Sequence, residues 1–158
     1  MAGTPADVEP AVRVFVAGEE ARRGAPVAQE ERAAIAERLR DGGAWLLLAR
    51  DATSVVGVAA GFDARTDDGR GEDVVPGLAH LSLVFVDPAR WGQGIGGAVL
   101  DAAIGEAARR GYERIQLWTH EDNERAHRLY VSRGFAHSGR TKVDDRGGGT
   151  IGLWSRAL

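Results

Sequence analysis

Four glycines within six residues make one short segment of this chain well suited to hold an anion. They follow a strand-like run at residues 80–86 and surround a helix start near Ile95. The four are Gly92, Gly94, Gly96 and Gly97. Glycines let a ligand approach the main chain and let successive N–H groups point into one concavity. The start of a helix adds unpaired N–H groups and the positive end of its dipole. The segment therefore predicts a phosphate site built from the backbone.

Two known phosphate-binding patterns fit this segment poorly. Gly92, Gly94 and Gly97 satisfy the spacing G-x-G-x-x-G of dinucleotide-binding folds, and Glu121 or Asp122 could take the place of the ribose-binding acid. However, residues 87–91 separate the strand from the glycines, and too few strand–helix–strand units remain for that sheet. A P-loop is weaker still, because no Gly-Lys-Ser/Thr follows the glycines.

A second motif lies downstream. Residues 123–135 read N-E-R-A-H-R-L-Y-V-S-R-G-F, and residues 86–96 read V-D-P-A-R-W-G-Q-G-I-G. Together they resemble the GCN5-related N-acetyltransferase (GNAT) family, whose motifs are N-x-x-A-x-x-L-Y-x-x-x-G-F and V-x-P-x-x-[RQ]-x-x-G-x-G/A. Residues 123–135 match their motif throughout, whereas residues 86–96 depart from theirs at Trp91, where the family usually has Arg or Gln. The resemblance covers residues 44–157, and the first forty residues match only in helical character.

The resemblance implies acetyl-coenzyme A as the co-substrate. Its pyrophosphate would bind the backbone of the glycine segment, and its pantetheine arm would pair with the main chain of Val84 and Val86 as a pseudo-strand. The Val84 amide would also face the thioester oxygen and stabilise the charge that develops there. Asn123 would cap a helix and contact the cofactor. The residues expected to bind the cofactor are Val84, Val86, Trp91, Gly92, Gln93, Gly94, Ile95, Gly96, Gly97, Asn123 and Tyr130.

Two proton-transfer roles follow from the same resemblance. Tyr130 matches the residue that protonates the departing thiolate, and a phenol with a pKa near 10 keeps its proton at pH 7 for that purpose. The places where relatives often carry a basic Glu hold His80 and Trp118 here. His80 is the predicted base, although a purely structural histidine is an equal alternative. Fallback bases at the following strand end are His120, Glu121 and Asp122, for which the sequence favours a role as solvated or capping groups. No metal site is expected.

The periodicity of apolar residues gives the elements that must position these groups. Helices are predicted at residues 4–23, 28–40 and 124–133. A further helix is predicted from Ile95 to Gly111, which caps its C-terminal end. Strands are predicted at 44–50, 55–63, 80–86, 113–119, 135–143 and 150–156. The first two strands form a hairpin, the third should be buried on both faces, and residues 65–77 form a long loop. The sequence leaves open whether residues 1–3 add a strand stub.

This order predicts a mixed α/β layer architecture. By the resemblance it is a central mixed sheet with helices on both faces, the acyl-CoA N-acyltransferase fold. With 158 residues, 44% of them hydrophobic, the chain is expected to form one domain, 1–158. The sequence shows no basic patch, no cysteine, no leader peptide and no membrane-spanning segment. We therefore expect a cytoplasmic protein that binds no nucleic acid or membrane. A homodimer is compatible with the sequence.

The predicted function is transfer of an acetyl group from acetyl-coenzyme A to a primary amine by direct attack. The acceptor is a small-molecule or peptide amine that the sequence does not identify. Acidic residues hint at a cationic one by simple attraction. They are Asp144 and Asp145 in the last hairpin and Asp67, Asp68, Glu72 and Asp73 in the long loop. The alternative function is a non-catalytic acyl-coenzyme A sensor of the same fold.

Overall fold

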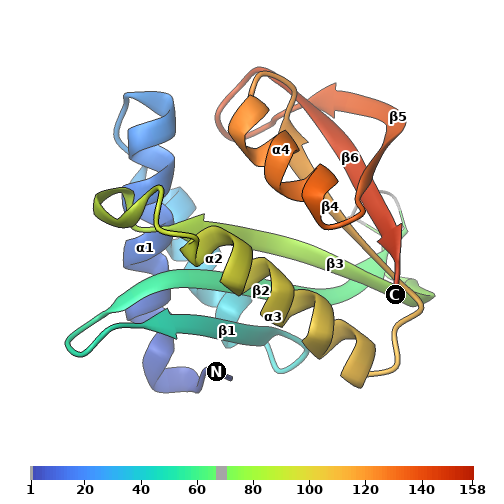
Figure 1. The fold of residues 1–158 in the computed structure, drawn as a ribbon, viewed down its shortest axis with the longest axis horizontal. Coiled ribbons are helices and arrows are strands. Elements are labelled where there is room, and N and C mark those ends of the chain that lie inside the picture. Colours follow the sequence, from blue (N-terminus) through green and yellow to red (C-terminus); the bar gives the residue numbers. More distant parts are fainter. Residues whose placement is uncertain (1, 67–70) are drawn as a thin grey trace. The chain divides into compact units, whose positions relative to one another are not determined.

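The computed structural model describes residues 2–66 and 71–158 (Figure 1). Within these residues the predicted order of elements is confirmed. The helices are η1 (Pro5–Asp7), α1 (Val8–Arg23), α2 (Gln29–Arg40), η3 (Pro88–Arg90), α3 (Ile95–Arg109) and α4 (Glu124–Ser132). The strands are β1 (Trp45–Arg50), β2 (Val55–Arg65), β3 (Val74–Val86), β4 (Arg114–His120), β5 (Ala136–Val143) and β6 (Thr150–Ala157).

The strands form one mixed sheet of order β1-β2-β3-β4-β6-β5. β3 and β4 are parallel, whereas β1–β2, β4–β6 and β5–β6 are antiparallel. This confirms the predicted mixed α/β architecture. The chain divides into two compact units, Met1–Gly61 with Leu83–Ala103, and Phe62–Ser82 with Ile104–Leu158. The single domain remains a prediction.

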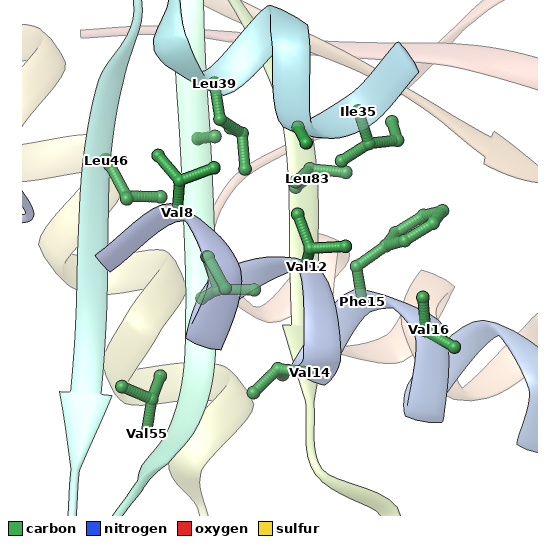
Figure 2. Packing of buried hydrophobic residues seen from close by; sticks show 14 of the residues in the cluster. Val8, Val12, Val14, Phe15, Val16, Ile35, Leu39, Leu46, Val55 and Leu83 are labelled. Atoms are coloured by element: carbon green, nitrogen blue, oxygen red, sulfur yellow. The ribbon is translucent and has the colours of Figure 1, made fainter. Parts of the chain in front are cut away.

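The core of the first unit lies between two helices and one face of β1 and β2. Buried side chains of α1 and α2, among them Phe15 and Ile35, form one cluster with Leu46, Val58 and Leu83 (Figure 2). The other face of β2 receives the start of α3. A Cβ built at Gly57 would lie 2.9 Å from the Cγ2 atoms of both Ile95 and Val99. A glycine at this point therefore lets α3 approach the sheet closely.

The N-terminus settles the question of a strand stub. Ala2 forms an antiparallel bridge with Leu47, and the N–H of Gly3 donates to the carbonyl of Leu46 over 2.7 Å. Residues 2 and 3 thus extend the β1 edge by a bridge too short to be a full strand. The predicted cap at Thr4 is confirmed, because its side chain and that of Asp7 form a capping box around η1.

The second unit packs α4 against one face of the β4–β6 pair. Along β4 the residues Ile115, Leu117 and Thr119 are buried, while the intervening side chains are partly exposed. The ring of Tyr130 on α4 meets Phe135 edge to face, with centroids 5.7 Å apart. The His127 ring lies 4.9 Å from the buried Trp154 of β6.

Two expectations about β3 are wrong. The strand begins at Val74, so the loop predicted at 65–77 is much shorter, and its residues 67–70, including Asp67 and Asp68, fall outside the described residues. Burial on both faces is also wrong, because buried Ala79, Leu81 and Leu83 alternate with partly exposed neighbours. The apolar content concealed this alternation, since Leu78, Val84 and Val86 are apolar but only partly buried.

Candidate functional site

The glycine segment is anchored at its start by hydrogen bonds and an ion pair. Asp87 follows β3, and its N–H donates to the carbonyl of Val56 in β2 over 2.8 Å. Its carboxylate accepts the N–H of Ala89 and so caps η3. Arg90 then pairs with Asp51 in the β1–β2 turn. Both ends of η3 are therefore fixed to the first hairpin, which sets where the segment leaves the sheet.

The segment presents a row of unused backbone donors. Gly92 and Gly94 have φ angles of 80° and 79°, which other residues rarely adopt, whereas Gly96 and Gly97 lie in the first turn of α3. Counted from Gly92, the first backbone N–H that donates a hydrogen bond is that of Ala98, which donates to the carbonyl of Gly94 over 3.1 Å. Among the described residues, the N–H groups of residues 92–97 have no hydrogen-bond acceptor. Six such donors at a helix start can hold a phosphate.

Trp91 contacts the end of β3. Its indole Nε1–H donates to the carbonyl of Val86 over 3.1 Å, and 41% of the residue remains exposed. Val84 and Val86 are partly buried at the end of the strand. The sequence identified Trp91 as the departure from the family motif; it did not predict that the indole bonds to a carbonyl expected to pair with the pantetheine arm.

Asn123 and Tyr130 lie on α4. The Asn123 side chain accepts the N–H of Ala126 over 3.2 Å, which confirms the predicted cap. Tyr130 is 7% exposed, and burial raises the pKa of its phenol above the ordinary value. Within the part of the chain that the structure describes, its hydroxyl has no hydrogen-bond partner. The phenol is thus kept protonated and left without a partner.

The predicted base, His80, belongs to a polar stripe on one face of the second unit. Residues 116, 118 and 120 of β4 point to this face, because side chains alternate along a strand. His80 is the β3 register partner of Gln116, whose Nε2 lies 3.4 Å from His80 Nδ1. The β3–β4 ladder ends one pair later, at Leu81 and Leu117. Trp118 and His120 therefore lie beyond the part of β4 that pairs with β3, although both still pair with β6.

Two histidine–carboxylate pairs fix the loops at this end of the sheet. His120 Nε2 lies 3.0 Å from Asp144 Oδ2 in the β5–β6 hairpin, and His137 Nε2 lies 2.7 Å from Glu121 Oε1. The backbone carbonyl of His120 accepts from His127 Nε2 over 2.9 Å. The sequence analysis named His120 and Glu121 as fallback bases and Asp144 as one of several acidic residues, but it did not predict these pairs. The β4–β6 register, which pairs His120 with Ile151 and brings the hairpin beside His120, is known only from the structure.

Cations cover the tryptophan of the stripe. Lys142 Nζ lies 4.4 Å from the centroid of a Trp118 ring, and the Arg140 guanidinium carbon lies 5.9 Å away. Both come from β5, whose side chains are otherwise largely exposed. The polar stripe therefore has positive charge on one side.

The predicted site residues thus fall into two sets. Val84, Val86 and residues 91–97 lie in the first unit, and His80, Asn123 and Tyr130 lie in the second. Among the described residues, no cluster of histidines and carboxylates has the arrangement of a metal site. No helix in the described part of the chain is long and apolar enough to cross a membrane.

Known proteins match this chain in sequence and in structure. The sequence profile described as "Acetyltransferase (GNAT) family" matches residues 13–135. A mycothiol acetyltransferase of Clavibacter sepedonicus is 38% identical over 92 residues, which are 58% of this chain and 27% of that protein. The chain thus spans about a quarter of the length of this curated relative.

Solved structures match over nearly the whole chain. A ribosomal-protein-alanine N-acetyltransferase from Brucella melitensis has a TM-score of 0.76 at 22% identity and covers 100% of this chain and 98% of its own. The PaiA N-acetyltransferase from Thermoplasma acidophilum, in complex with coenzyme A, has a TM-score of 0.71 at 13% identity and covers 100% and 98%. At these identities the likeness concerns the fold.

Proposed function

The chain belongs to the GNAT family of acetyltransferases, and we propose that it transfers the acetyl group of acetyl-coenzyme A to a primary amine by direct attack. The observation that carries the proposal is the row of N–H groups at residues 92–97, which have no acceptor among the described residues. A structural neighbour with coenzyme A bound supports this choice of donor.

The donor is proposed to be held by main-chain atoms. The diphosphate accepts from the amides of the glycine segment, and each hydrogen bond to a charged group contributes about 1.5–3 kcal/mol. A few such bonds suffice for micromolar affinity, about −8 kcal/mol, without a lysine. The pantetheine arm pairs with the backbone of Val84 and Val86, and the Val84 amide donates to the thioester oxygen as negative charge develops on it.

The leaving thiolate is proposed to take its proton from Tyr130. Burial raises the pKa of this phenol, so it remains protonated over the working pH range. Its hydroxyl has no partner within the described residues and is available to the sulfur. Because the phenolate is costly in a buried place, the proton must be replaced quickly. Asn123, which caps the same helix, is proposed as a cofactor contact.

The acceptor amine is proposed to approach along the polar stripe to which His80 and Gln116 belong. The structure weakens the argument that acidic residues attract a cationic acceptor. Asp144 is bonded to His120 and accepts the N–H of Arg146. The cations of β5 also cover Trp118. The relatives' names, mycothiol acetyltransferase and ribosomal-protein-alanine N-acetyltransferase, differ in acceptor. We therefore keep the broad class of small-molecule or peptide amines.

Calorimetric titration with acetyl-coenzyme A tests donor binding, and release of free thiol across a panel of amines tests transfer. We expect saturable binding and thiol release with at least one amine. Binding without turnover on any amine would favour the alternative, a sensor of acyl-coenzyme A. A folded protein that gives neither heat nor saturation would overturn the proposal.

A further inference from the structure

Resting on the proposed acetyl transfer, we propose that His120, oriented by Asp144, is the base that takes the proton from the acceptor amine. His120 is the last residue of β4 and lies on the same face of the sheet as His80. It comes four residues after Gln116, the β4 residue that pairs with His80. The assignment depends on which ring nitrogen of each histidine carries a free lone pair.

The bonding of His120 leaves Nδ1 free to accept a proton. A carboxylate only accepts hydrogen bonds, so the contact with Asp144 puts the ring proton on Nε2 and the lone pair on Nδ1. Among the described residues, Nδ1 has no partner. Gly149 passes beside it, and a Cβ built there would lie 3.5 Å from Nδ1. A distance of 3.5 Å is an ordinary van der Waals contact, so the turn passes close to this nitrogen without bonding to it.

The other histidines are less suited to this role. His137 has both nitrogens engaged, since Nε2 donates to Glu121 and Nδ1 accepts the N–H of Gly139 over 2.8 Å. His127 donates to a neutral carbonyl and packs on Trp154, and among the described residues it forms no ion pair with a carboxylate. In His80, Nδ1 faces the side-chain amide of Gln116. His120 combines a charged partner on Nε2 with an Nδ1 that has no hydrogen-bond partner among the described residues.

The position of His120 also favours it. His120 comes three residues after Leu117, the last β4 residue paired with β3. His80 lies within the part of β3 that pairs with β4, whereas His120 lies beyond it. The carbonyl of His120 also accepts from His127, three residues before Tyr130 on α4, which links the proposed base to the helix of the proposed acid.

Other ionisable groups on the neighbouring elements will influence any pH profile. On the chain after β4 and on α4 they are Glu121, Asp122, Glu124 and His127. On β5 and its hairpin they are Lys142, Asp144, Asp145 and Arg146. Glu121 is already bonded to His137, and Asp144 is the partner that distinguishes His120.

The proton transfers balance as follows. Nδ1 of neutral His120 takes one proton from the ammonium group, and the freed amine attacks the acetyl carbon. The carbon–sulfur bond then breaks, and the thiolate takes the proton of Tyr130. The nitrogen loses its second proton through solvent as the amide forms, and this replaces the proton of Tyr130. His120 finally returns its proton to solvent, so one proton is released per acetyl group transferred.

The test compares two acceptors in variants of the whole protein. The best alkyl amine of the panel is protonated at pH 7, whereas O-methylhydroxylamine is not and has no need of a base. We expect His120→Gln to lower kcat/KM for the alkyl amine about a hundredfold at pH 7. The loss should shrink as pH rises and be small for O-methylhydroxylamine. Asp144→Asn should show a weaker form of the same pattern and serves if the first variant does not fold.

His137→Gln is the matched control, because it removes a histidine–carboxylate pair that the mechanism does not use. It should retain activity with both acceptors, and all variants should bind acetyl-coenzyme A as the unmodified protein does. The assignment would be overturned if His120→Gln lost activity equally with both acceptors or kept its rates unchanged. It would also be overturned if His80→Gln showed the pattern expected of His120→Gln. If the unmodified protein binds no acetyl-coenzyme A or acetylates no amine, the proposed function fails first and the base assignment with it.

Discussion

At the scale of single residues, Trp91 is the departure from the family motif with the clearest physical effect. Its indole donates to the Val86 carbonyl, one of the groups expected to pair with the pantetheine arm. A carbonyl has two lone pairs, so the indole need not exclude the ligand, but it competes for the same oxygen. With the proposed pairing of the pantetheine arm, binding of acetyl-coenzyme A includes the cost of loosening this internal hydrogen bond.

Removing that donor should tighten binding. We expect Trp91→Phe to lower the Kd for acetyl-coenzyme A about fivefold, because a neutral hydrogen bond contributes about 1 kcal/mol. Calorimetric titration measures the change. An unchanged or raised Kd would mean that the indole supports the cofactor rather than competing with it.

The two tyrosines of the chain allow a matched comparison. Tyr130→Phe should lower kcat about a hundredfold, because the thiolate loses its acid, and should leave the Kd for acetyl-coenzyme A nearly unchanged. The control is Tyr112→Phe, since the Tyr112 hydroxyl is bonded to Asp63 over 2.6 Å and has no proposed catalytic role. Steady-state kinetics with equal loss in both variants would argue against the assignment of Tyr130.

At the scale of elements, the start of α3 depends on a glycine beneath it. Gly57→Ala would put a methyl group 2.9 Å from stiff side-chain atoms of Ile95 and Val99, so either α3 or β2 must shift. We expect a loss of about 1–3 kcal/mol in the free energy of unfolding, as for other overpacked sites. Weaker binding of acetyl-coenzyme A should accompany it, because the donors at residues 92–97 move with the helix.

Gly105 provides the control within the same helix. A Cβ at Gly105 meets no atom within 4 Å, so Gly105→Ala should stabilise the protein by about 0.5–1 kcal/mol through lower chain entropy. Urea denaturation of both variants measures the difference. Similar changes in both would show that crowding at β2 does not govern the position of α3.

The elements differ in how well the sequence predicted them. The glycine segment, α3 and α4 were predicted closely, because their signals are local: the glycines of residues 92–97, Gly111 after α3 and the capping Asn123 before α4. The start of β3 was missed, because Pro76 and Gly77 suggest a turn and only pairing partners distant in the sequence stabilise a strand there. The bond between His120 and Asp144 was missed for a similar reason, since 24 residues separate them in the sequence.

At the scale of the whole molecule, stability should decline at both ends of the pH range. The N–H groups of Thr53 and Ser54 lower the pKa of Asp51 to about 2, and Arg109 lowers that of Glu106 to about 2. Both carboxylates therefore contribute stability above pH 4 that is lost as pH falls from about 4 to 2. Burial raises the pKa of Tyr130, so its contribution is present below pH 10 and lost above it, where the unfolded chain ionises.

Thermal melts from pH 2 to 11 measure both limbs. We expect Tyr130→Phe to flatten the alkaline limb while leaving the acid limb in place. Asp51→Asn should reduce the acid limb alone. An alkaline limb of the same steepness in Tyr130→Phe would show that other groups cause it.

The domain organisation can be tested by calorimetry. The boundaries between the two compact units fall inside β2, β3 and α3, so three continuous elements belong to both units. Unfolding one unit alone would break hydrogen bonds within all three shared elements, and we therefore expect a single transition with equal calorimetric and van't Hoff enthalpies. Two resolved peaks would contradict the single domain predicted from the sequence.

The cation above Trp118 has a practical consequence. Lys142 is the only lysine in the chain, and every other basic side chain, histidine aside, is an arginine. A fluorophore coupled to lysine would therefore attach at one internal position, against the indole of β4, where stacking quenches or shifts its emission. An acceptor that enters beside the indole would displace the dye, so a single coupling reaction gives an optical reporter of acceptor binding.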